Sequence, residues 1–305
     1  MKKFLIQIMF FSTLTALSLA MVLSLEDGHT DPFYIRFTTP RQNNLIIGTS
    51  RAAQGLQPSV FQEVLNMNIH NYSFTKLNSP FGRVYLESIK RKLVTNTSNG
   101  IFIVTVGPWS ISSFSDNPND STMFRENNLF LAKTKVVNIN PNPFYLLNDL
   151  DHKYKTLFFK RRSPMYLHDD GWLEVTINMD SLAVEERLEK KILFYKTNTL
   201  TLSKLSSLRL HYLIKTINYL NHYGEVYLVR LPLHPKMMEI ETLYMPKFDS
   251  IIQEAKDIST GYLDLTEYNS EFIYTDGNHL YKESGKKVSK MIAEWIYDRR
   301  QNNNE

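Results

Sequence analysis

The sequence predicts an α/β fold in which helices cover both faces of a mostly parallel, five-stranded sheet, the doubly wound arrangement. Short apolar runs typical of buried strands recur along the chain, segments of helical periodicity separate several of them, and a helical stripe closes the chain. A membrane helix is expected before this domain and an inserted cap region within it. The five strand-like runs are residues 45–47, 68–74, 101–106, 226–229 and 261–265.

The composition is that of an ordinary globular protein. Hydrophobic residues make up 43% of the 305 residues and charged residues 22%, which argues against wholesale disorder. The net charge is only +4, and the densest basic run, residues 160–162, is interpreted as solvated surface, so no nucleic-acid partner is predicted. The chain has no cysteine, which excludes disulfides, thiolate metal sites, a cysteine nucleophile and a lipid-modified cysteine.

The amino terminus predicts a membrane segment. Two lysines precede residues 4–23, which carry no charge. About twenty residues suffice to cross a hydrocarbon core of roughly 30 Å, and the positive flank favours a cytoplasmic amino terminus. Residues 1–24 are therefore expected to anchor a domain that faces the periplasm or the extracellular side. The small residues at 18–20 leave a cleaved signal peptide, and hence secretion, as the alternative.

Residues 25–41 are polar, contain glycine and prolines, and are expected to link the anchor to a domain over 42–300. After the first two strands, the spacing of Phe81, Tyr85, Ile89 and Leu93 predicts an amphipathic helix with the basic residues 90–92 turned outward.

The alternation of strand-like and helical segments is interrupted over about residues 110–200. An interruption of this length inside an α/β domain indicates an insertion or cap over the site. Within it, Asp169-Asp170-Gly171 predicts a hairpin turn before a strand at 172–177. Residues 301–305 are expected to be a flexible tail. Two further helices are predicted by apolar stripes, one of Leu202, Leu205, Leu213, Ile217 and Leu220, the other of Val288, Met291, Ile292, Trp295 and Ile296.

A candidate nucleophile follows the first strand, in the run Gly48-Thr49-Ser50-Arg51. In open α/β sheets, ligands bind beyond the carboxyl ends of the strands, and a small residue there permits a tight turn that lifts Ser50 above the sheet edge. Backbone N–H groups at the start of the next helix could then support an oxyanion. The alternative is that Ser50 only caps this helix.

A candidate base and its orienting acid lie in the last loop, in the run Asp276-Gly277-Asn278-His279. An aspartate three residues before a histidine can hold one imidazole nitrogen while the other faces a serine hydroxyl. Each motif alone is weak, and a surface loop explains the second one equally well. Their joint occurrence, at the first strand end and in the last loop, predicts a Ser50, Asp276 and His279 triad.

These two motifs resemble the SGNH (GDSL-like) hydrolase superfamily, whose members carry a Gly-x-Ser element after the first strand and an Asp-x-x-His pair before the last helix. Residues 46–51 look like its divergent bacterial branch associated with cell-surface acylation. The resemblance covers roughly 42–109 and 224–298, and it implies an SGNH/flavodoxin-like fold. The family also completes its oxyanion hole with a glycine after the second strand and with an asparagine in a Gly-x-Asn-Asp motif after the third.

This chain departs from that pattern after the third strand, where Gly107-Pro108-Trp109-Ser110 contains no asparagine. Gly82, with Ser73 as a competitor, is the candidate for the family's glycine donor. Four further residues are candidates for substrate binding near the sheet edge, and for each of them a purely structural role is the alternative: Arg51, Trp109, Arg230 and His234.

The resemblance implies a serine esterase or O-acyltransferase that acts on acyl esters, acetyl esters above all, of a cell-surface glycan. It leaves room for an integral-membrane acyltransferase as donor partner. A catalytically inactive glycan-binding or accessory protein is the alternative, and a lipase or thioesterase at the membrane surface is a third. The sequence shows no phosphate loop, dinucleotide motif or metal-spaced cluster, so no cofactor and no metal are predicted.

Overall fold

The computed structural model describes residues 1–149, 155–158 and 163–302. The expected basic run 160–162 and the last three residues of the expected tail lie outside this range. The five predicted strands form one parallel sheet of order β2-β1-β3-β8-β9. Strand β2 is shorter than the predicted run at 68–74. The strands are β1 (Leu45–Ile47), β2 (His70–Asn71), β3 (Gly100–Thr105), β8 (Gly224–Arg230) and β9 (Gly261–Asp264).

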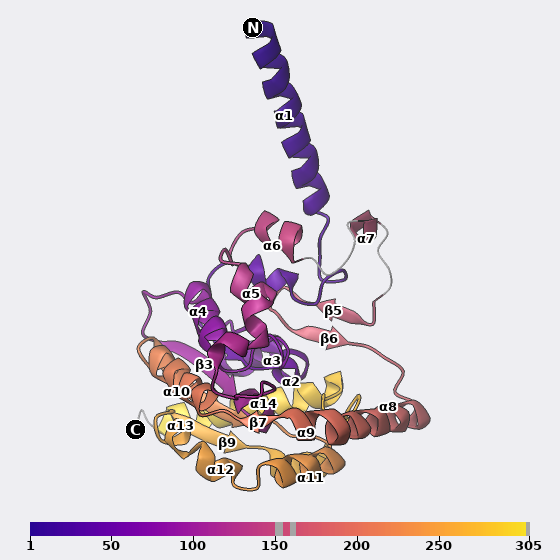
Figure 1. Cartoon of the computed structure of the whole chain (residues 1–305). Coiled ribbons are helices and arrows are strands. Elements are labelled where there is room, and N and C mark those ends of the chain that lie inside the picture. The colour runs from indigo at the N-terminus through magenta and orange to yellow at the C-terminus, as the bar shows by residue number, and fades with distance from the viewer. Residues whose placement is uncertain (150–154, 159–162, 303–305) are drawn as a thin grey trace.

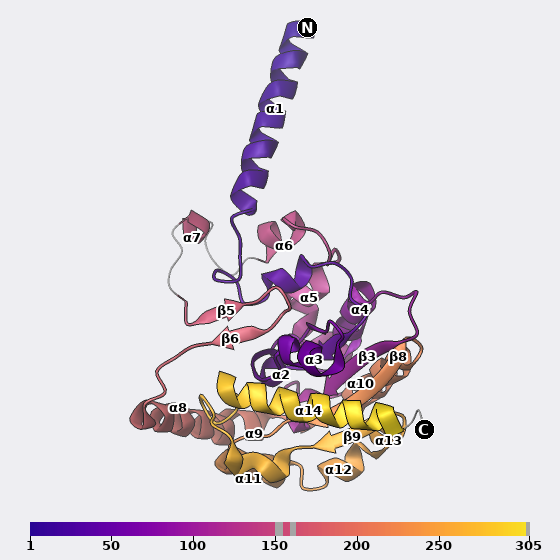
Figure 2. The ribbon, with the colours of Figure 1, turned by 180° about the vertical axis from the view of Figure 1, so that it is seen from behind.

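Helices cover both faces of this sheet, so the predicted fold class is confirmed. Because side chains alternate along a strand, Ile101 and Ile103 of β3 pack on one face while Phe102 and Val104 pack on the other. The first face carries α2 (Ser50–Gly55), α3 (Pro58–Leu65) and α14 (Lys282–Asn302), of which α14 crosses in front in the view from behind (Figure 2). The second face carries α4 (Arg83–Lys92), α10 (Ser207–Asn221), α12 (Phe248–Ile251) and α13 (Gln253–Asp257).

The helix before β8 begins later than predicted. Leu202 and Leu205 were expected on its apolar stripe, but they are 52% and 40% exposed and precede α10. The side chain of Ser206 caps α10 by accepting a hydrogen bond from the amide of Arg209. Leu205 instead belongs to the short strand β7 (Lys204–Leu205).

Lys92 is buried, whereas the outward basic face of the predicted helix had included it. The side chain of Lys92 at the end of α4 donates hydrogen bonds to the carbonyl and hydroxyl oxygens of Thr39 and to the carbonyl of Val137. These partners come from the segment 25–41, which follows the amino-terminal apolar helix, and from the insertion. The ammonium therefore joins both of these segments to the second face of the sheet.

The amino-terminal helix α1 (Lys2–Leu23) projects away from the folded body (Figure 1). Its 22 residues span about 33 Å at 1.5 Å per residue, enough for a hydrocarbon core. Only Leu23 is buried, so packing against the described residues does not explain the apolar side chains along the helix. This geometry suits both an anchor and a signal sequence.

The segment 25–41 had been expected to form a polar linker. In the structure it contains a short 3-10 helix, η1 (Tyr34–Phe37), whose four residues are all buried. The Arg36 guanidinium donates to the carbonyls of Asn71 and Gly171, at 3.1 and 2.7 Å. The segment is thus packed between the edge strand β2 and the insertion.

The insertion is built from short elements. Its hairpin, β5 (Met165–Leu167) and β6 (Leu173–Val175), confirms the predicted turn, in which Gly171 has a φ of +85°. A second antiparallel pair joins β7 to β4 (Ser112–Ser113). The other elements before α10 are η2 (Pro108–Ile111), η3 (Ser121–Met123), η4 (Arg125–Asn128), α5 (Phe130–Lys133), α6 (Pro143–Asn148), α7 (Lys155–Phe158), α8 (Ser181–Phe194), the π-helical turn η5 (Tyr195–Thr199) and α9 (Leu200–Leu202).

Candidate active site

The turn after β1 places Ser50 at the start of α2 with its hydroxyl directed at an imidazole. Gly48 is required there by packing, because a Cβ at this position would lie 1.9 Å from Thr105 Oγ1. Thr49 is the residue that precedes the helix, in an extended conformation, and Ser50 is the first helical residue. Ser50 is therefore not the helix cap that the alternative interpretation had assumed. Its Oγ lies 2.9 Å from Nε2 of His279.

The loop before α14 holds the imidazole from its other side. Nδ1 of His279 lies 3.0 Å from each carboxylate oxygen of Asp276. The backbone amides of Asn278 and His279 also donate to this carboxylate, at 3.0 and 3.1 Å. A carboxylate accepts only, so Nδ1 carries the proton that faces Asp276 and Nε2 is left to accept from the Ser50 hydroxyl.

Asp276 is ionised in this environment. Burial by itself would raise its pKa, but the His279 imidazole and the Lys191 ammonium outweigh burial and hold the pKa well below its usual range. Lys191 Nζ lies 2.8 Å from Asp276 Oδ2. The Ser50, His279 and Asp276 side chains thus form a continuous relay from a hydroxyl to a fixed negative charge.

Helix α8 of the insertion holds the loop that carries this relay. In addition to the Lys191 ion pair, Nε of Arg187 donates to the carbonyl of Thr275 at 2.7 Å. Leu188, which is buried, lies against Gly277, where a Cβ would come within 2.4 Å of Leu188 Cδ1. Gly277 also has a φ of +83°, a conformation that favours glycine.

The turn after α8 contributes one more contact to the loop. Asn278 donates its side-chain N–H to the hydroxyl of Tyr195 at 2.8 Å. No sequence motif marks Arg187, Leu188, Lys191 or Tyr195, and only the position of the insertion indicates a role over the site. The signal that could have found α8 is its pattern of acidic and basic residues over 14 residues.

The hairpin of the insertion holds the helix that carries Ser50. Trp172 donates its indole N–H to the carbonyl of Gln54, in α2, at 2.9 Å. Leu167 and Leu173 of the hairpin pack with Ala53 of the same helix. The insertion therefore contacts the helix that carries Ser50 through β5 and β6, and the loop that carries His279 through α8.

Arg51 is engaged inside the protein. Its guanidinium pairs with Glu241 at 3.0 Å and donates to the carbonyl of Leu231 at 2.7 Å. The side chain is only 12% exposed. These contacts tie α2, the helix that carries Ser50, to α11 (Pro235–Tyr244), so the Arg51 guanidinium is engaged inside the protein rather than offered to solvent.

Arg230 is engaged in a similar way. It is buried, lies over the ring of Phe248 at 4.6 Å, and pairs with Asp249 and Asp264, each at 3.4 Å, and with Glu241 at 3.9 Å. Its charge is thus surrounded by three carboxylates of the same chain.

His234 contacts the loop that carries Asp276 and His279. Its backbone amide donates to the carbonyl of Gly277 at 2.9 Å. Its Nδ1 accepts from the amide of Lys236 and caps α11, which assigns the proton to Nε2. Burial lowers the pKa of His234, and the neighbouring Lys236 charge adds to this.

The two residues expected to donate to the oxyanion, Ser73 and Gly82, make other contacts in the structure. Ser73 is fully buried, its amide donates to the side chain of Asn71, and its hydroxyl donates to the carbonyl of Ile46. Gly82 precedes α4, where a Cβ would come within 3.0 Å of Glu126 Oε1. An oxyanion role for either residue stays a prediction.

Trp109 lines a small cavity of about 30 Å³ together with Thr49 and Arg51, the two neighbours of Ser50. Its ring is 5% exposed and stacks on Tyr244 at 4.6 Å, so it presents no open face to a sugar ring. Its buried indole nitrogen has no hydrogen-bond partner within the part of the chain that the structure describes. Among the same residues, no group of three His, Asp or Glu side chains could hold a metal ion.

Comparison with known proteins gives little beyond this geometry. No protein-family model matches the chain, and no curated protein matches it. Among solved structures, the chain is similar to the inhibitor-bound form of an M. smegmatis aryl esterase, with 10% sequence identity and a TM-score of 0.36, over 85% of this chain and 99% of that one. At this level of similarity the comparison does not indicate an activity for this chain.

Proposed function

We propose that this chain is a serine esterase or O-acyltransferase that acts on acyl esters through Ser50, His279 and Asp276. The observation that carries the proposal is the unbroken relay, with Oγ to Nε2 at 2.9 Å and Nδ1 to the carboxylate at 3.0 Å. These distances are within hydrogen-bond reach, and the order of groups is that of a nucleophile, a general base and an orienting acid.

The first half of the reaction transfers the acyl group to the enzyme. Ser50 Oγ attacks the ester carbonyl while His279 Nε2 takes the hydroxyl proton, which forms a tetrahedral oxyanion. The intermediate collapses with cleavage of the bond between the carbonyl carbon and the alkoxy oxygen. His279 returns the proton to the departing alcohol, and Ser50 is left as its acyl ester.

The second half repeats these steps with a new acceptor. His279 deprotonates the acceptor hydroxyl, whose oxygen attacks the acyl carbon, and the bond to Ser50 Oγ breaks as Ser50 recovers its proton. Water as acceptor makes the protein an esterase, and a sugar hydroxyl makes it an acyltransferase. Asp276 keeps its charge throughout and stabilises the imidazolium that forms in each half.

Two donors are proposed for the oxyanion. The first is the backbone amide of Ser50, which lies at the start of α2, before the amide of Ala52, which donates to the carbonyl of Thr49. The indole N–H of Trp109 is the second, because it stands two residues after Gly107, where the resembled family has its asparagine. It also lacks a partner within the described residues and lines the cavity beside Ser50. A buried donor without a partner is costly unless a ligand satisfies it.

The proposed substrate is an acetylated glycan of the cell surface. The SGNH-like motifs and the exposed apolar helix α1 support this, since a domain tethered outside the membrane meets surface polysaccharide. The two lysines before α1 favour the outside location. If the full chain in detergent neither removes acetyl groups from nor adds them to any of a panel of glycans, the glycan proposal fails.

The absence of the family's asparagine favours a second candidate, an accessory protein that keeps the fold without catalysis. A serine-reactive fluorophosphonate separates the two candidates. We expect stoichiometric labelling of the full chain, located at Ser50 by peptide mass spectrometry, and much slower labelling of the His279→Ala variant. Labelling that stays at the level of a Ser50→Ala control would favour the accessory protein.

A further inference from the structure

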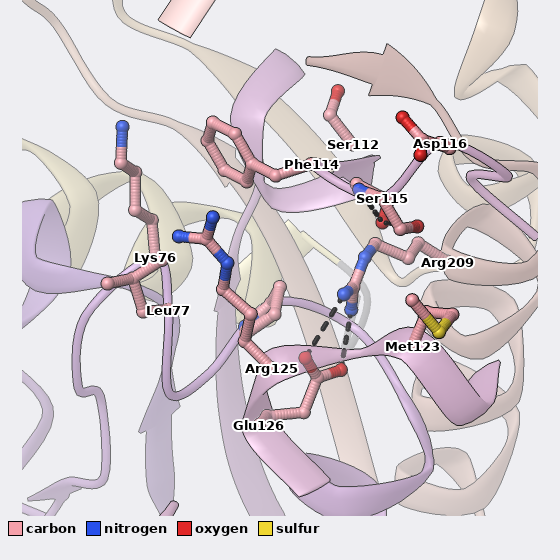
Figure 3. Close-up of a pocket in the computed structure, with 12 residues that line it drawn as sticks. Lys76, Leu77, Ser112, Phe114, Ser115, Asp116, Met123, Arg125, Glu126 and Arg209 are labelled. Carbon is pink, nitrogen blue, oxygen red and sulfur yellow. Dashed lines mark hydrogen bonds and ion pairs between the residues drawn. The ribbon is translucent and has the colours of Figure 1, made fainter. Parts of the chain in front are cut away.

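A second cavity, of about 250 Å³, is shown in Figure 3, and one of the residues that line it, Lys76, has its ammonium 4.6 Å from the centre of the Tyr195 ring. Its walls come from the loop after β2, from β4 and the residues that follow it, from η4 and from α10. Its charged lining residues and one aromatic ring are Lys76, Asp116, Arg125, Glu126, Arg209 and Phe114.

One side of this cavity is positively charged. The Lys76 ammonium lies 5.2 Å from the centre of the Phe114 ring, and the Arg125 guanidinium lies 5.6 Å from it. Figure 3 shows both cations on the same side of the pocket, with Asp116 on the opposite side. Within the described residues, neither cation forms an ion pair, and the side chain of Lys76 donates only to the hydroxyl of Thr199, at 3.3 Å.

One carboxylate that lines the cavity, that of Glu126, is already paired. Glu126 makes a buried two-point ion pair with Arg209, at 2.8 and 3.1 Å, which leaves no net charge at that wall. Burial lowers the pKa of Lys76 to about 8, and the charges of Lys191 and Arg125 add to this effect. Asp116, the other carboxylate among the described lining residues, lies on the opposite side of the cavity, so the side with Lys76 and Arg125 keeps a positive charge.

Tyr195 connects this cavity to the catalytic loop. Lys76 Nζ lies 4.6 Å from the centre of the Tyr195 ring, and the Tyr195 hydroxyl accepts from Asn278, the residue before His279. A group bound between Lys76 and Arg125 would therefore be held one aromatic ring away from the loop that carries the base.

We propose that this cavity binds an oxyanion group, a carboxylate or a phosphate, carried by the glycan whose ester is processed at Ser50. The Lys76 ammonium and the Arg125 guanidinium bind the anion, and the Phe114 ring gives an apolar face to the adjoining sugar. This assignment rests on the proposed function and adds to it that the substrate is an anionic glycan.

The test compares two acetyl esters on the full chain in detergent at low salt. O-Acetylated oligogalacturonate carries the anion, and O-acetylated xylo-oligosaccharide is the neutral counterpart. We expect kcat/KM to be about tenfold or more higher for the anionic ester, since a charged hydrogen bond is worth this much. We expect Lys76→Met and Arg125→Met each to remove most of that ratio.

Two further variants make the comparison specific. Lys76→Arg keeps the charge and should keep the preference, while Lys287→Met, on exposed α14 at the other face of the sheet, should leave it unchanged. A ratio near one for the wild-type chain, or an equal loss in Lys287→Met, would overturn the proposal. An O-acetylated hexose phosphate in the same assay distinguishes a phosphate ligand from a carboxylate ligand.

A binding arm separates failure of this inference from failure of the proposed function. Oligogalacturonate is titrated calorimetrically into the Ser50→Ala chain with and without Lys76→Met. Weaker binding in the double variant supports the cavity even if no ester is hydrolysed. Equal binding, or none to either chain, contradicts the cavity even if Ser50 is an active nucleophile.

Discussion

Ser50 differs from an ordinary helix-capping serine because Thr49 precedes the helix and the Ser50 hydroxyl faces His279 at 2.9 Å. The sequence predicted this placement, together with Asp276 and His279, because all three lie in short motifs next to strands or in the last loop. In a parallel sheet the carboxyl ends of the strands share one edge, so such residues are brought together by topology.

The role of Arg51 and Arg230 could not be predicted in the same way. Both follow or end a strand near the site, yet both are directed at Glu241, which comes from α11. The position at the sheet edge was predictable, but the ion-pair partners were not. Glu241 lies 190 residues after Arg51, and the carboxylates around Arg230, although nearer in the sequence, stand in no motif. Trp109 is similar, since its burial depends on Tyr244 and on the insertion.

Replacing Trp109 by phenylalanine tests the proposed oxyanion donor. Trp109→Phe keeps an aromatic ring on Tyr244 and removes only the indole N–H, so we expect kcat for an acetyl ester to fall about 10²–10³-fold with little change in KM. Steady-state kinetics with 4-nitrophenyl acetate measure this. Trp172→Phe, which also loses an indole N–H but at α2 rather than in the cavity, is the matched control. Equal effects of the two changes would remove Trp109 from the oxyanion site.

Among the secondary-structure elements, helix α8 holds the loop that carries His279 and the β5–β6 hairpin holds the helix that carries Ser50. Helix α8 contacts the histidine loop through Arg187, Leu188 and Lys191, and the hairpin contacts α2 through Trp172. The position of an insertion over the site was predictable because the alternation of strands and helices is interrupted there. Its contacts were not, because α8 buries only Leu188 and so shows little amphipathic pattern.

The ion pair between α8 and Asp276 is expected to matter for rate more than for folding. Lys191→Met removes a positive charge 2.8 Å from Asp276 and leaves the carboxylate held by His279 and two amides. We expect kcat to fall about tenfold, as for the loss of a partly buried charged contact, with a small change in melting temperature. Lys190→Met, on the exposed side of the same helix, is the control and should retain full activity. If both variants behave alike, α8 does not act through Asp276.

At the scale of the whole molecule, the segment after α1 is the joint between the exposed helix and the folded domain. Composition predicted a polar linker, and within this segment Tyr34, Ile35, Arg36 and Phe37 are buried against the edge of the sheet and the insertion. Polar composition alone could not reveal this, because Arg36 satisfies backbone carbonyls that are distant in the sequence.

Glu26 makes the stability of this joint depend on pH. Burial raises the pKa of Glu26 from 4.5 to about 7, partly offset by Thr30 and increased by Asp31 and Asp27. Because the folded pKa is above the unfolded one, the stability from the neutral form is fully present below about pH 4.5 and is lost as pH rises through about 7.

Glu26→Gln should remove this dependence. Relative to wild type, the variant should gain on the order of 2 kcal/mol at pH 8 and little near pH 4.5. Thermal unfolding of the full chain in detergent at the two pH values measures the difference. The exposed Glu63→Gln change is the control. A gain that is the same at both pH values would show that burial of the charge is not its cause.

Hydrolysis of 4-nitrophenyl acetate by the full chain shows directly whether Ser50 is a nucleophile that His279 activates. The Ser50→Ala and His279→Ala variants are measured beside the wild type. We expect turnover by the wild type that falls by about 10³-fold or more in each variant, with the double variant no worse than either alone, because the two residues act as a unit. A wild-type rate equal to that of both variants, in folded protein of unchanged melting temperature, would contradict the claim.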